Sequence, residues 1–277
     1  MINNLKKYDI LPNTISGGTL YIGEAYVPGI DFEKLRKIRI FLPFNYNEID
    51  RFPVVYMMDG KNLFDKYTSF AGEWEVDEVL EKRIKDGKQS YIVVGIDSRE
   101  TDQGRIEEML PSNKYLEEET IGGKIESFGE KLGDWIVNDL KIEIDKLFKT
   151  LPDKKNTSII GSSMGGLFAF YMGLKYKDVF DLAGCFSPAF LLYENNKFIE
   201  ELEKYQVSEE LPKLYFLVGN IEFENEFIIQ TKAAYDIFKN KGVSDKKIKL
   251  IHDLEGIHHE SFWNKYLDDL FDFYENK

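Results

Sequence analysis

The chain has 277 residues, of which 43% are hydrophobic and 14% aromatic, and its formal net charge is −13. This length and apolar content are enough to bury one large core, so we expect a single α/β domain over residues 1–277. A strongly acidic chain is a poor match for phosphate-rich surfaces. We therefore expect neither nucleic acid nor an anionic membrane as a partner.

The first residues lack the apolar core and small-residue cleavage site of a signal peptide, and no apolar window long enough to cross a membrane follows. The expected location is the cytoplasm. Cys185 is the one cysteine, which excludes an internal disulfide, and its apolar neighbours predict a buried packing role. Nothing in the sequence indicates an oligomeric state.

Strand-like and helix-like segments alternate along most of the chain. Helices between strands require parallel pairing, whereas the two leading strands have no helix between them and can form a hairpin. The sequence predicts an eight-stranded, mostly parallel sheet with helices on both faces. The expected strands are residues 19–27, 37–43, 53–58, 91–96, 157–161, 181–186, 213–218 and 248–254, and the expected helices are 73–86, 125–149, 164–176, 227–240 and 260–275.

Two stretches, residues 97–122 and 187–212, do not fit this alternation. Long irregular segments in a compact domain are usually functional or mobile, and both of these leave the carboxyl ends of strands. Ligands of open α/β sheets bind at that edge. We expect the two stretches to form the walls of a pocket.

Residues 159–166 read Ile-Ile-Gly-Ser-Ser-Met-Gly-Gly, an apolar strand end that runs into G-x-S-x-G and then into an apolar helical stretch. A serine raised on a tight strand-to-helix turn needs small residues at Gly161 and Gly165, since a Cβ there would crowd the backbone. The helix that follows points its N-terminal N–H groups at developing negative charge. This pattern predicts a nucleophile at Ser163.

The three histidines, His252, His258 and His259, all lie near the end of the chain. A serine nucleophile needs an imidazole to take its proton and return it to the leaving group, and only this cluster can supply one. His258 and His259 fall on the loop after the last expected strand, where the base of such an enzyme belongs. His252 lies inside that strand, and a polar structural role is expected for it. The residues alone do not separate His258 from His259.

A serine nucleophile and a histidine base need an acid as the third catalytic residue. We expect this acid directly after the strand that precedes the last one. Glu222, Glu224 and Glu226 follow the apolar residues 213–219 directly, and an acid there would hold the imidazole tautomer. Glu222 is the preferred candidate and Glu224 the alternative. Glutamates in this position can also be the solvated first turn of the helix expected over residues 227–240, where the helix dipole favours them.

An oxyanion hole needs two backbone donors, one from the residue after the nucleophile and one from the loop after the third strand. Met164 follows the serine, and Lys61 follows Asp59-Gly60. Taken alone, Asp59-Gly60 is an ordinary turn. Beside an elbow and a late histidine, it predicts that the Met164 and Lys61 N–H groups form the oxyanion hole.

These segments together resemble the putative-esterase family of α/β-hydrolases, which includes S-formylglutathione hydrolase, feruloyl, acetylxylan and siderophore esterases and the mycolyltransferases. The resemblance covers nearly the whole chain from residue 40 onward. It implies the α/β-hydrolase fold and a Ser163-His258-Glu222 triad, because the closing G-x-H-x-E-x-x-W segment selects His258. The matching segments are residues 53–65 (D-G-x-N-L-F-D after a strand), 105–111 (R-x-x-E-y-x-P), 161–166 (G-x-S-M-G-G), 218–222 (G-x-x-E) and 256–263.

Arg105 opens the R-x-x-E-y-x-P segment, in which Met109 and Leu110 depart from the usual aromatic. A guanidinium on a pocket loop suits a carboxylate, phosphate or phenolate of the substrate. We therefore expect Arg105 to bind substrate. The alternative is that it holds the loop by pairing with Glu107, Glu108 or another acid.

The sequence thus predicts a serine carboxylic ester hydrolase that acts on a small-molecule ester through an acyl-enzyme. No cofactor is expected, and adjacent histidines without a spaced partner make a poor metal site. The alternatives are an acyltransferase of the same fold, in which an alcohol replaces water, and a non-catalytic binding protein. Acyl length and the nature of the alcohol depend on the two irregular stretches, so the sequence does not identify the ester.

Overall fold

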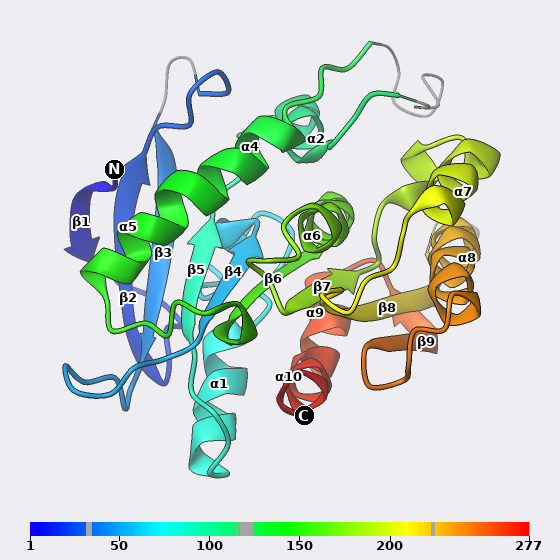
Figure 1. The fold of residues 1–277 in the computed structure, drawn as a ribbon. Helices are drawn as coiled ribbons and strands as arrows, with labels where there is room; N and C mark the ends of the chain where they lie inside the picture. The colour runs from blue at the N-terminus through cyan, green and yellow to red at the C-terminus, as the bar shows by residue number, and fades with distance from the viewer. Residues whose placement is uncertain (32–34, 115, 117–123, 223–224, 277) are drawn as a thin grey trace.

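A computed structural model of the protein describes residues 1–31, 35–114, 116, 124–222 and 225–276. Within them, nine strands form one sheet in the order β1-β2-β3-β5-β4-β6-β7-β8-β9 (Figure 1). The strands are β1 (Asn3–Lys7), β2 (Gly18–Ala25), β3 (Arg36–Pro43), β4 (Val54–Met58), β5 (Ile92–Ile96), β6 (Thr157–Ser162), β7 (Leu182–Phe186), β8 (Lys213–Ile221) and β9 (Ile248–Ile257).

Strands β2 and β3 form the expected antiparallel hairpin, and β3 pairs antiparallel with β5. From β5 to β9 every neighbouring pair is parallel. The predicted mostly parallel sheet is therefore confirmed, but the predicted count of eight strands is wrong by one. The missed strand, β1, pairs only with β2 at the sheet edge, and Leu5 is its one residue that is not exposed. It has no apolar run that could have revealed it.

The helices cover both faces of the sheet, as predicted (Figure 1). One apolar layer contains side chains of α4, α5, α6 and α8, and the layer on the opposite face contains side chains of α1 and α10. The helices are α1 (Val76–Lys85), α2 (Asp102–Met109), α4 (Gly129–Trp135), α5 (Lys141–Leu147), α6 (Met164–Lys175), α7 (Asn195–Lys204), α8 (Glu226–Asn240), α9 (Glu260–Trp263) and α10 (Leu267–Glu275).

The two stretches expected to be irregular contain helices. Helix α2 lies in residues 97–122, and its first turn is capped by the Thr101 hydroxyl, which accepts from the Gly104 N–H at 3.0 Å. Helix α7 and a short 3-10 turn, Phe190–Leu192, lie in residues 187–212. Both helices are short and interrupt the strand-helix alternation, which is why pattern reading missed them. Residues 115 and 117–122 of the first stretch lie outside the described residues.

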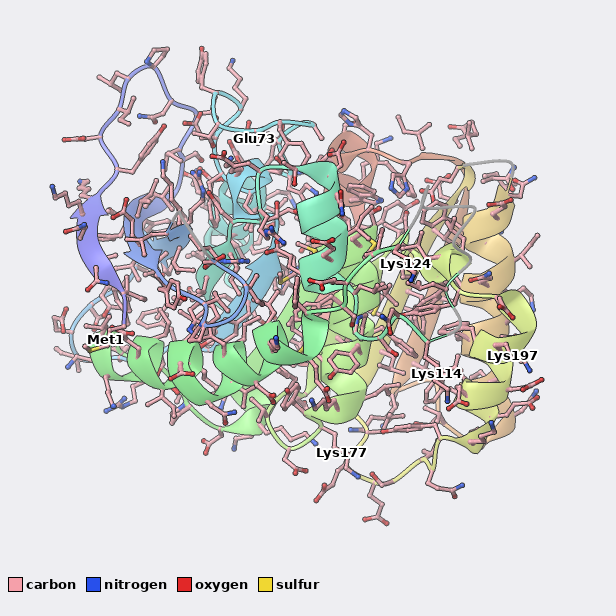
Figure 2. All side chains as sticks on the ribbon, turned by 90° about the horizontal axis from the view of Figure 1, so that it is seen from above. Met1, Glu73, Lys114, Lys124, Lys177 and Lys197 are labelled. Carbon is pink, nitrogen blue, oxygen red and sulfur yellow. The ribbon has the colours of Figure 1, made fainter. Side chains whose placement is uncertain are left out.

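The long helix expected over residues 125–149 begins at Gly129 and is divided by a π-helical turn, Ile136–Leu140, into α4 and α5. Cys185 is fully buried in β7, as expected. Seen from above, Met1 at the β1 edge and Lys197 on α7 lie at opposite ends of the molecule (Figure 2). No helix within the described residues is both long enough and apolar enough to cross a bilayer.

Candidate active site

Ser163 occupies the turn between β6 and α6, with φ 55° and ψ −119°. Such a conformation is costly for a residue with a side chain. The glycines beside it are required by space, because a Cβ at Gly161 would lie 2.3 Å from the Gly165 carbonyl oxygen. A Cβ at Gly165 would lie 3.0 Å from the Cβ of Met58, at the end of β4. The G-x-S-x-G pattern therefore forms the sharp elbow that the sequence predicts.

The backbone of this elbow is tied to the next strand. The Ser163 N–H donates to the Phe186 carbonyl at 2.9 Å, and the Ser163 carbonyl accepts from the Ala189 N–H at 3.1 Å. The same carbonyl also accepts from the Leu167 N–H at 3.0 Å, which begins helix α6. These bonds hold the strained residue in place.

Glu222 and His258 come together at the same edge of the sheet. Strands β8 and β9 pair in parallel, so the residues that follow them meet at their carboxyl ends. The carboxylate Oε2 of Glu222 lies 3.7 Å from Nδ1 of His258, and the Glu222 side chain is fully buried. This separation is longer than a hydrogen bond, as is common in unliganded sites.

Two aromatic rings set the orientation of the His258 imidazole. The Phe227 ring lies 4.6 Å from it between centroids, and the Trp263 ring meets it edge-on at 5.0 Å and 86°. The side chain keeps 21% of its surface exposed. The ring is thus packed in place but still reachable by a substrate.

The other carboxylate oxygen of Glu222, Oε1, accepts from the Ser187 hydroxyl at 2.7 Å and from the Gly219 N–H at 3.3 Å. The Ser187 oxygen in turn accepts from the indole N–H of Trp263 at 2.9 Å. Sequence reasoning gave Ser187 no role. Its one available signal was its place directly after the strand expected over residues 181–186.

Ser187 also links Glu222 to the elbow at Ser163. It lies between Phe186 and Ala189, the two residues whose backbone groups bond to Ser163. Since β6, β7 and β8 are parallel neighbours, the elbow, Ser187 and Glu222 all project from one edge of the sheet.

The remaining histidines have structural partners. His252 is exposed in β9, with Nε2 3.2 Å from the Asn220 side-chain oxygen. His259 caps α9, because its Nδ1 accepts from the Ser261 N–H at 3.1 Å. The role of His258 as the base stays a prediction.

Of the other acids considered for this role, the structure describes Glu226. Glu226 is exposed at the first turn of α8, where the solvated-helix interpretation applies to it. Glu224 lies outside the described residues.

The loop expected to supply Lys61 to the oxyanion hole lies beside the elbow, because β4 and β6 are parallel neighbours. Asp59 takes the left-handed conformation at φ 55°, and residues Gly60–Asn62 form a single 3-10 turn. Gly60 is required there, since a Cβ would lie 2.6 Å from the Asp97 carboxylate. The Asn62 side chain donates to Glu260 at 2.8 Å, and burial raises the pKa of Glu260 above its ordinary value. The loop is therefore held rigidly, as a backbone donor requires.

Arg105 faces this loop from α2. Its Nε and Nη2 each donate to one carboxylate oxygen of Asp59 at 2.7 Å, and Nη2 lies 3.5 Å from the Ser162 carbonyl. Burial alone would lower the pKa of Arg105, but the Asp59 carboxylate outweighs it and raises that pKa. In the alternative interpretation, Arg105 holds the loop through an ion pair, and Asp59 is the acid with which it pairs. Substrate binding by Arg105 stays a prediction.

The two other acids considered for Arg105 have partners of their own. Glu107 pairs with Arg99 at 3.2 Å, and Glu108 pairs with Arg36 at 2.6 Å. The helix that carries Arg105 is therefore held by several ion pairs, of which the Glu108–Arg36 pair reaches the sheet at β3.

Each of the two stretches that we expect to form pocket walls lines a cleft. A cleft of about 530 Å³ beside the loop at residues 59–62 is lined by Lys61 together with Asp97, Ser98 and Arg99. A second, about 390 Å³ and largely apolar, lies between the two stretches, with Pro111 on one side and Tyr193 on the other. That these clefts receive substrate stays a prediction.

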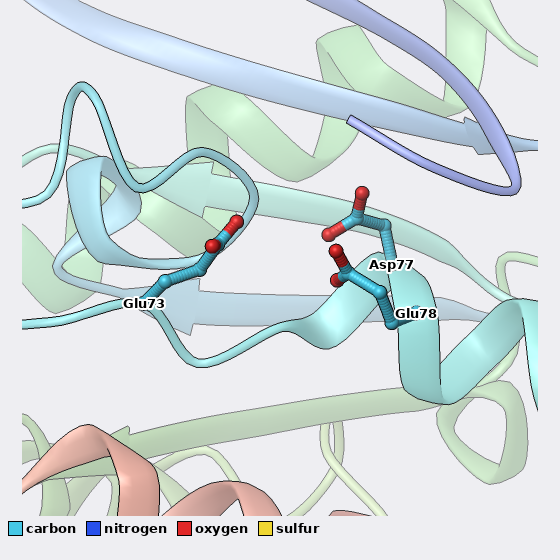
Figure 3. Close-up of side chains that lie close together, drawn as sticks. All are labelled: Glu73, Asp77 and Glu78. Carbon is cyan, nitrogen blue, oxygen red and sulfur yellow. The ribbon is translucent and has the colours of Figure 1, made fainter. Parts of the chain in front are cut away.

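The carboxylates of Glu73, Asp77 and Glu78 lie within 4.8 Å of one another and could hold a metal ion (Figure 3). Two of them already bind the N-terminal segment. Thr14 Oγ1 donates to Glu73 at 2.9 Å, and the Ser16 N–H donates to Asp77 at 2.7 Å. Burial and the charge of Glu78 raise the pKa of Asp77 to about 9, so a shared proton accounts for the close approach. The prediction of no metal is not tested by this geometry.

The model of the family described as "Putative esterase" matches residues 31–271. The chain belongs to this family. The uncharacterized protein YbbA of Bacillus subtilis (strain 168) is 23% identical over 242 residues, which cover 83% of this chain and 88% of that protein. An acetyl esterase of Caldicellulosiruptor saccharolyticus is 26% identical over 201 residues, 59% of this chain and 69% of that enzyme.

Solved structures of esterases share the fold of this member of the putative esterase family. A ferulic acid esterase superposes with a TM-score of 0.66 at 17% identity, covering 92% of this chain and 96% of that one. The enterobactin esterase of Shigella flexneri gives a TM-score of 0.68 at 18% identity, covering 87% of this chain and 55% of that one. The α/β-hydrolase-type fold is confirmed, and family membership supports carboxylic ester hydrolysis.

Proposed function

We propose that this member of the putative esterase family is a serine carboxylic ester hydrolase that works through an acyl-enzyme. Ser163 is the nucleophile, His258 the general base and then acid, and Glu222 the carboxylate that orients His258. The observation that carries the proposal is the strained elbow at Ser163, which lies at the same sheet edge as the buried Glu222 and the partly exposed His258. Strain of this kind is retained where a side chain must be presented for chemistry.

In the proposed reaction, His258 Nε2 takes the Ser163 proton as Oγ attacks the ester carbonyl carbon. The tetrahedral oxyanion is bound by the Met164 and Lys61 N–H groups. His258 then returns the proton to the departing alkoxide, leaving an acyl-serine and a free alcohol. Water, deprotonated by His258, attacks the acyl-serine and releases the carboxylic acid.

The named relatives suggest the substrate class. The lining of the cleft of about 530 Å³ includes Lys61, the proposed oxyanion donor, but neither Ser163 nor His258, so the size of this cleft does not select the ester. Acetyl and feruloyl esters are the first candidates, since one relative is an acetyl esterase and another, an endo-1,4-beta-xylanase/feruloyl esterase of Xylanibacter ruminicola, is 25% identical over 170 residues. That alignment covers 59% of this chain and 21% of that enzyme.

A burst experiment tests the proposal. With p-nitrophenyl acetate we expect one equivalent of p-nitrophenol in a fast phase, followed by slower turnover. A fluorophosphonate should add to Ser163, which mass spectrometry of the digested protein locates. A panel of acetyl, longer acyl, feruloyl and cyclic siderophore esters then identifies the substrate. The absence of hydrolysis and of labelling would leave a non-catalytic binding protein, and a rate that rises with added alcohols would indicate acyl transfer.

A further inference from the structure

Ser187 combines three features that a packing residue does not need. It follows β7 with φ 41°, a left-handed conformation that is strained for any residue except glycine. It is fully buried, and its N–H donates to the Leu217 carbonyl at 2.7 Å. Glycine would adopt this backbone without cost, so the side chain must justify the strain. Strained backbone of this kind clusters at functional sites.

The hydroxyl of Ser187 is placed between Trp263 and Glu222. Trp263 has only a donor, so its indole N–H occupies an acceptor site of the Ser187 oxygen at 2.9 Å. The Ser187 proton is then directed to Glu222 Oε1 at 2.7 Å. With Oε1 held in this way, Oε2 is the oxygen that faces His258 Nδ1 at 3.7 Å.

Trp263 acts on the same pair from the other side. Its ring meets the His258 imidazole edge-on at 5.0 Å while its N–H binds Ser187. One indole therefore sets both the orientation of the imidazole and the direction of the hydroxyl that holds the acid.

We propose that Ser187 and Trp263 are positioning residues, which direct one oxygen of Glu222 to His258 through the relay Trp263 N–H to Ser187 O–H to Glu222. The inference rests on the proposed function, because it assigns the acid and base of that reaction. A carboxylate with one oxygen committed to a charge-assisted hydrogen bond keeps a single orientation, which the second oxygen needs in order to hold the imidazole tautomer.

The test compares Ser187→Ala and Ser187→Gly with Ser158→Ala. Ser158 is a buried serine in β6 whose hydroxyl bonds to no other described residue, so its replacement controls for the loss of a buried hydroxyl. We expect both Ser187 variants to lower kcat for p-nitrophenyl acetate and the rate of fluorophosphonate labelling by roughly tenfold to a hundredfold, with KM little changed. Ser158→Ala should keep both rates.

Two further readouts separate positioning from folding. Without the hydroxyl, the Glu222 carboxylate loses the donor that orients it and stabilises the protonated imidazole less well. The low-pH limb of the kcat/KM profile should therefore move to lower pH, by about one unit. Ser187→Gly relieves the backbone strain, so it should unfold at no lower temperature than Ser187→Ala and still be slow.

Trp263→Phe keeps a ring beside His258 but removes the donor, and it should be slowed less than Ser187→Ala. Adding it to Ser187→Ala should cause little further loss, since the two act through one relay. The inference is overturned if folded Ser187→Ala labels and turns over like the wild type at every pH, or if its loss matches that of Ser158→Ala. If the wild-type protein itself is neither labelled nor active, the proposed function fails instead.

Discussion

Glu222 and Asp77 are both fully buried carboxylates, but their surroundings differ. Glu222 accepts from a serine hydroxyl and a backbone N–H, and its second oxygen faces an imidazole. Asp77 accepts from the Ser16 N–H, and close to it lie the acids Glu73 and Glu78. Among the described residues, no lysine, arginine or histidine pairs with these three acids.

This difference separates a carboxylate that can serve chemistry from one that serves folding. A buried acid beside a base and several donors can orient that base. A buried acid beside other acids retains a proton and acts as a hydrogen-bonding group. Glu222 and Asp77 both carry a buried carboxylate, so the neighbouring residues decide the role of each. Each of the following substitutions strengthens or breaks that distinction.

Replacement of the nucleophile should have the largest effect. Ser163→Ala removes the attacking oxygen, which no neighbouring group replaces, so ester hydrolysis should fall on the order of 10⁴-fold or more. The alanine keeps the elbow backbone, and circular dichroism and the melting temperature should stay close to the wild-type values. Hydrolysis at an undiminished rate by this folded variant would remove Ser163 from the reaction.

The two adjacent histidines should behave differently. His258→Ala should lose nearly as much activity as Ser163→Ala, because the triad members act as a unit. His259→Ala should keep most activity but lose about 1 kcal/mol of unfolding free energy, since its Nδ1 caps α9. Steady-state rates and denaturant titrations of both variants check this. Equal catalytic losses would show that the base is misassigned.

An isosteric amide tests the acid. In Glu222→Gln, the side-chain amide can present N–H to His258 Nδ1, which forces the wrong imidazole tautomer. We expect kcat to fall on the order of 10³-fold with the fold retained. A variant with near-normal kcat would show that another residue is the acid, and Glu224 is the first to test.

Arg105→Gln tests the link between α2 and the loop at residues 59–62, the proposed oxyanion loop. The change leaves the buried Asp59 carboxylate without its bidentate partner, and breaking such pairs costs about 3–5 kcal/mol. A loop-holding role predicts a lower melting temperature and a similar fall in kcat/KM for neutral acetyl esters and anionic esters. A rise in KM confined to anionic esters, at an unchanged melting temperature, would instead show that Arg105 binds substrate charge.

The smallest effect is expected at Asp77. Its pKa, raised from 3.8 to about 9 by burial and by Glu78, means that the folded state holds the proton more tightly. The resulting stability is complete below about pH 4 and is lost as the pH rises toward 9.

Asp77→Asn is neutral at every pH and can still accept from Ser16. Its melting temperature relative to the wild type should therefore rise between pH 5 and pH 8. A gain of about 1 kcal/mol corresponds to about 2–4 °C. Ester hydrolysis should be unchanged. An identical pH dependence in both proteins would contradict the shared-proton interpretation.

The sequence alone determined the elements whose patterns are local. The apolar runs and helical spacings predicted every strand from β2 to β9, and the glycines around Ser163 predicted a turn that only they can form. It did not predict β1, whose residues are mostly exposed, or the short helices α2 and α7. Marginal elements of this kind are stabilised by their tertiary neighbours rather than by their own sequence pattern.

Only the tertiary structure decided which side chains meet. Sequence spacing proposed Ser163, His258 and Glu222 separately, but the parallel order β6-β7-β8-β9 is what brings the ends of these strands to one edge. It also brought together pairs that no spacing in the sequence predicts: Ser187 with Glu222, and Arg105 with Asp59, 46 positions apart. Contacts between distant segments depend on strand order and on the packing of helices against the sheet, and neither is written in any short stretch of the chain.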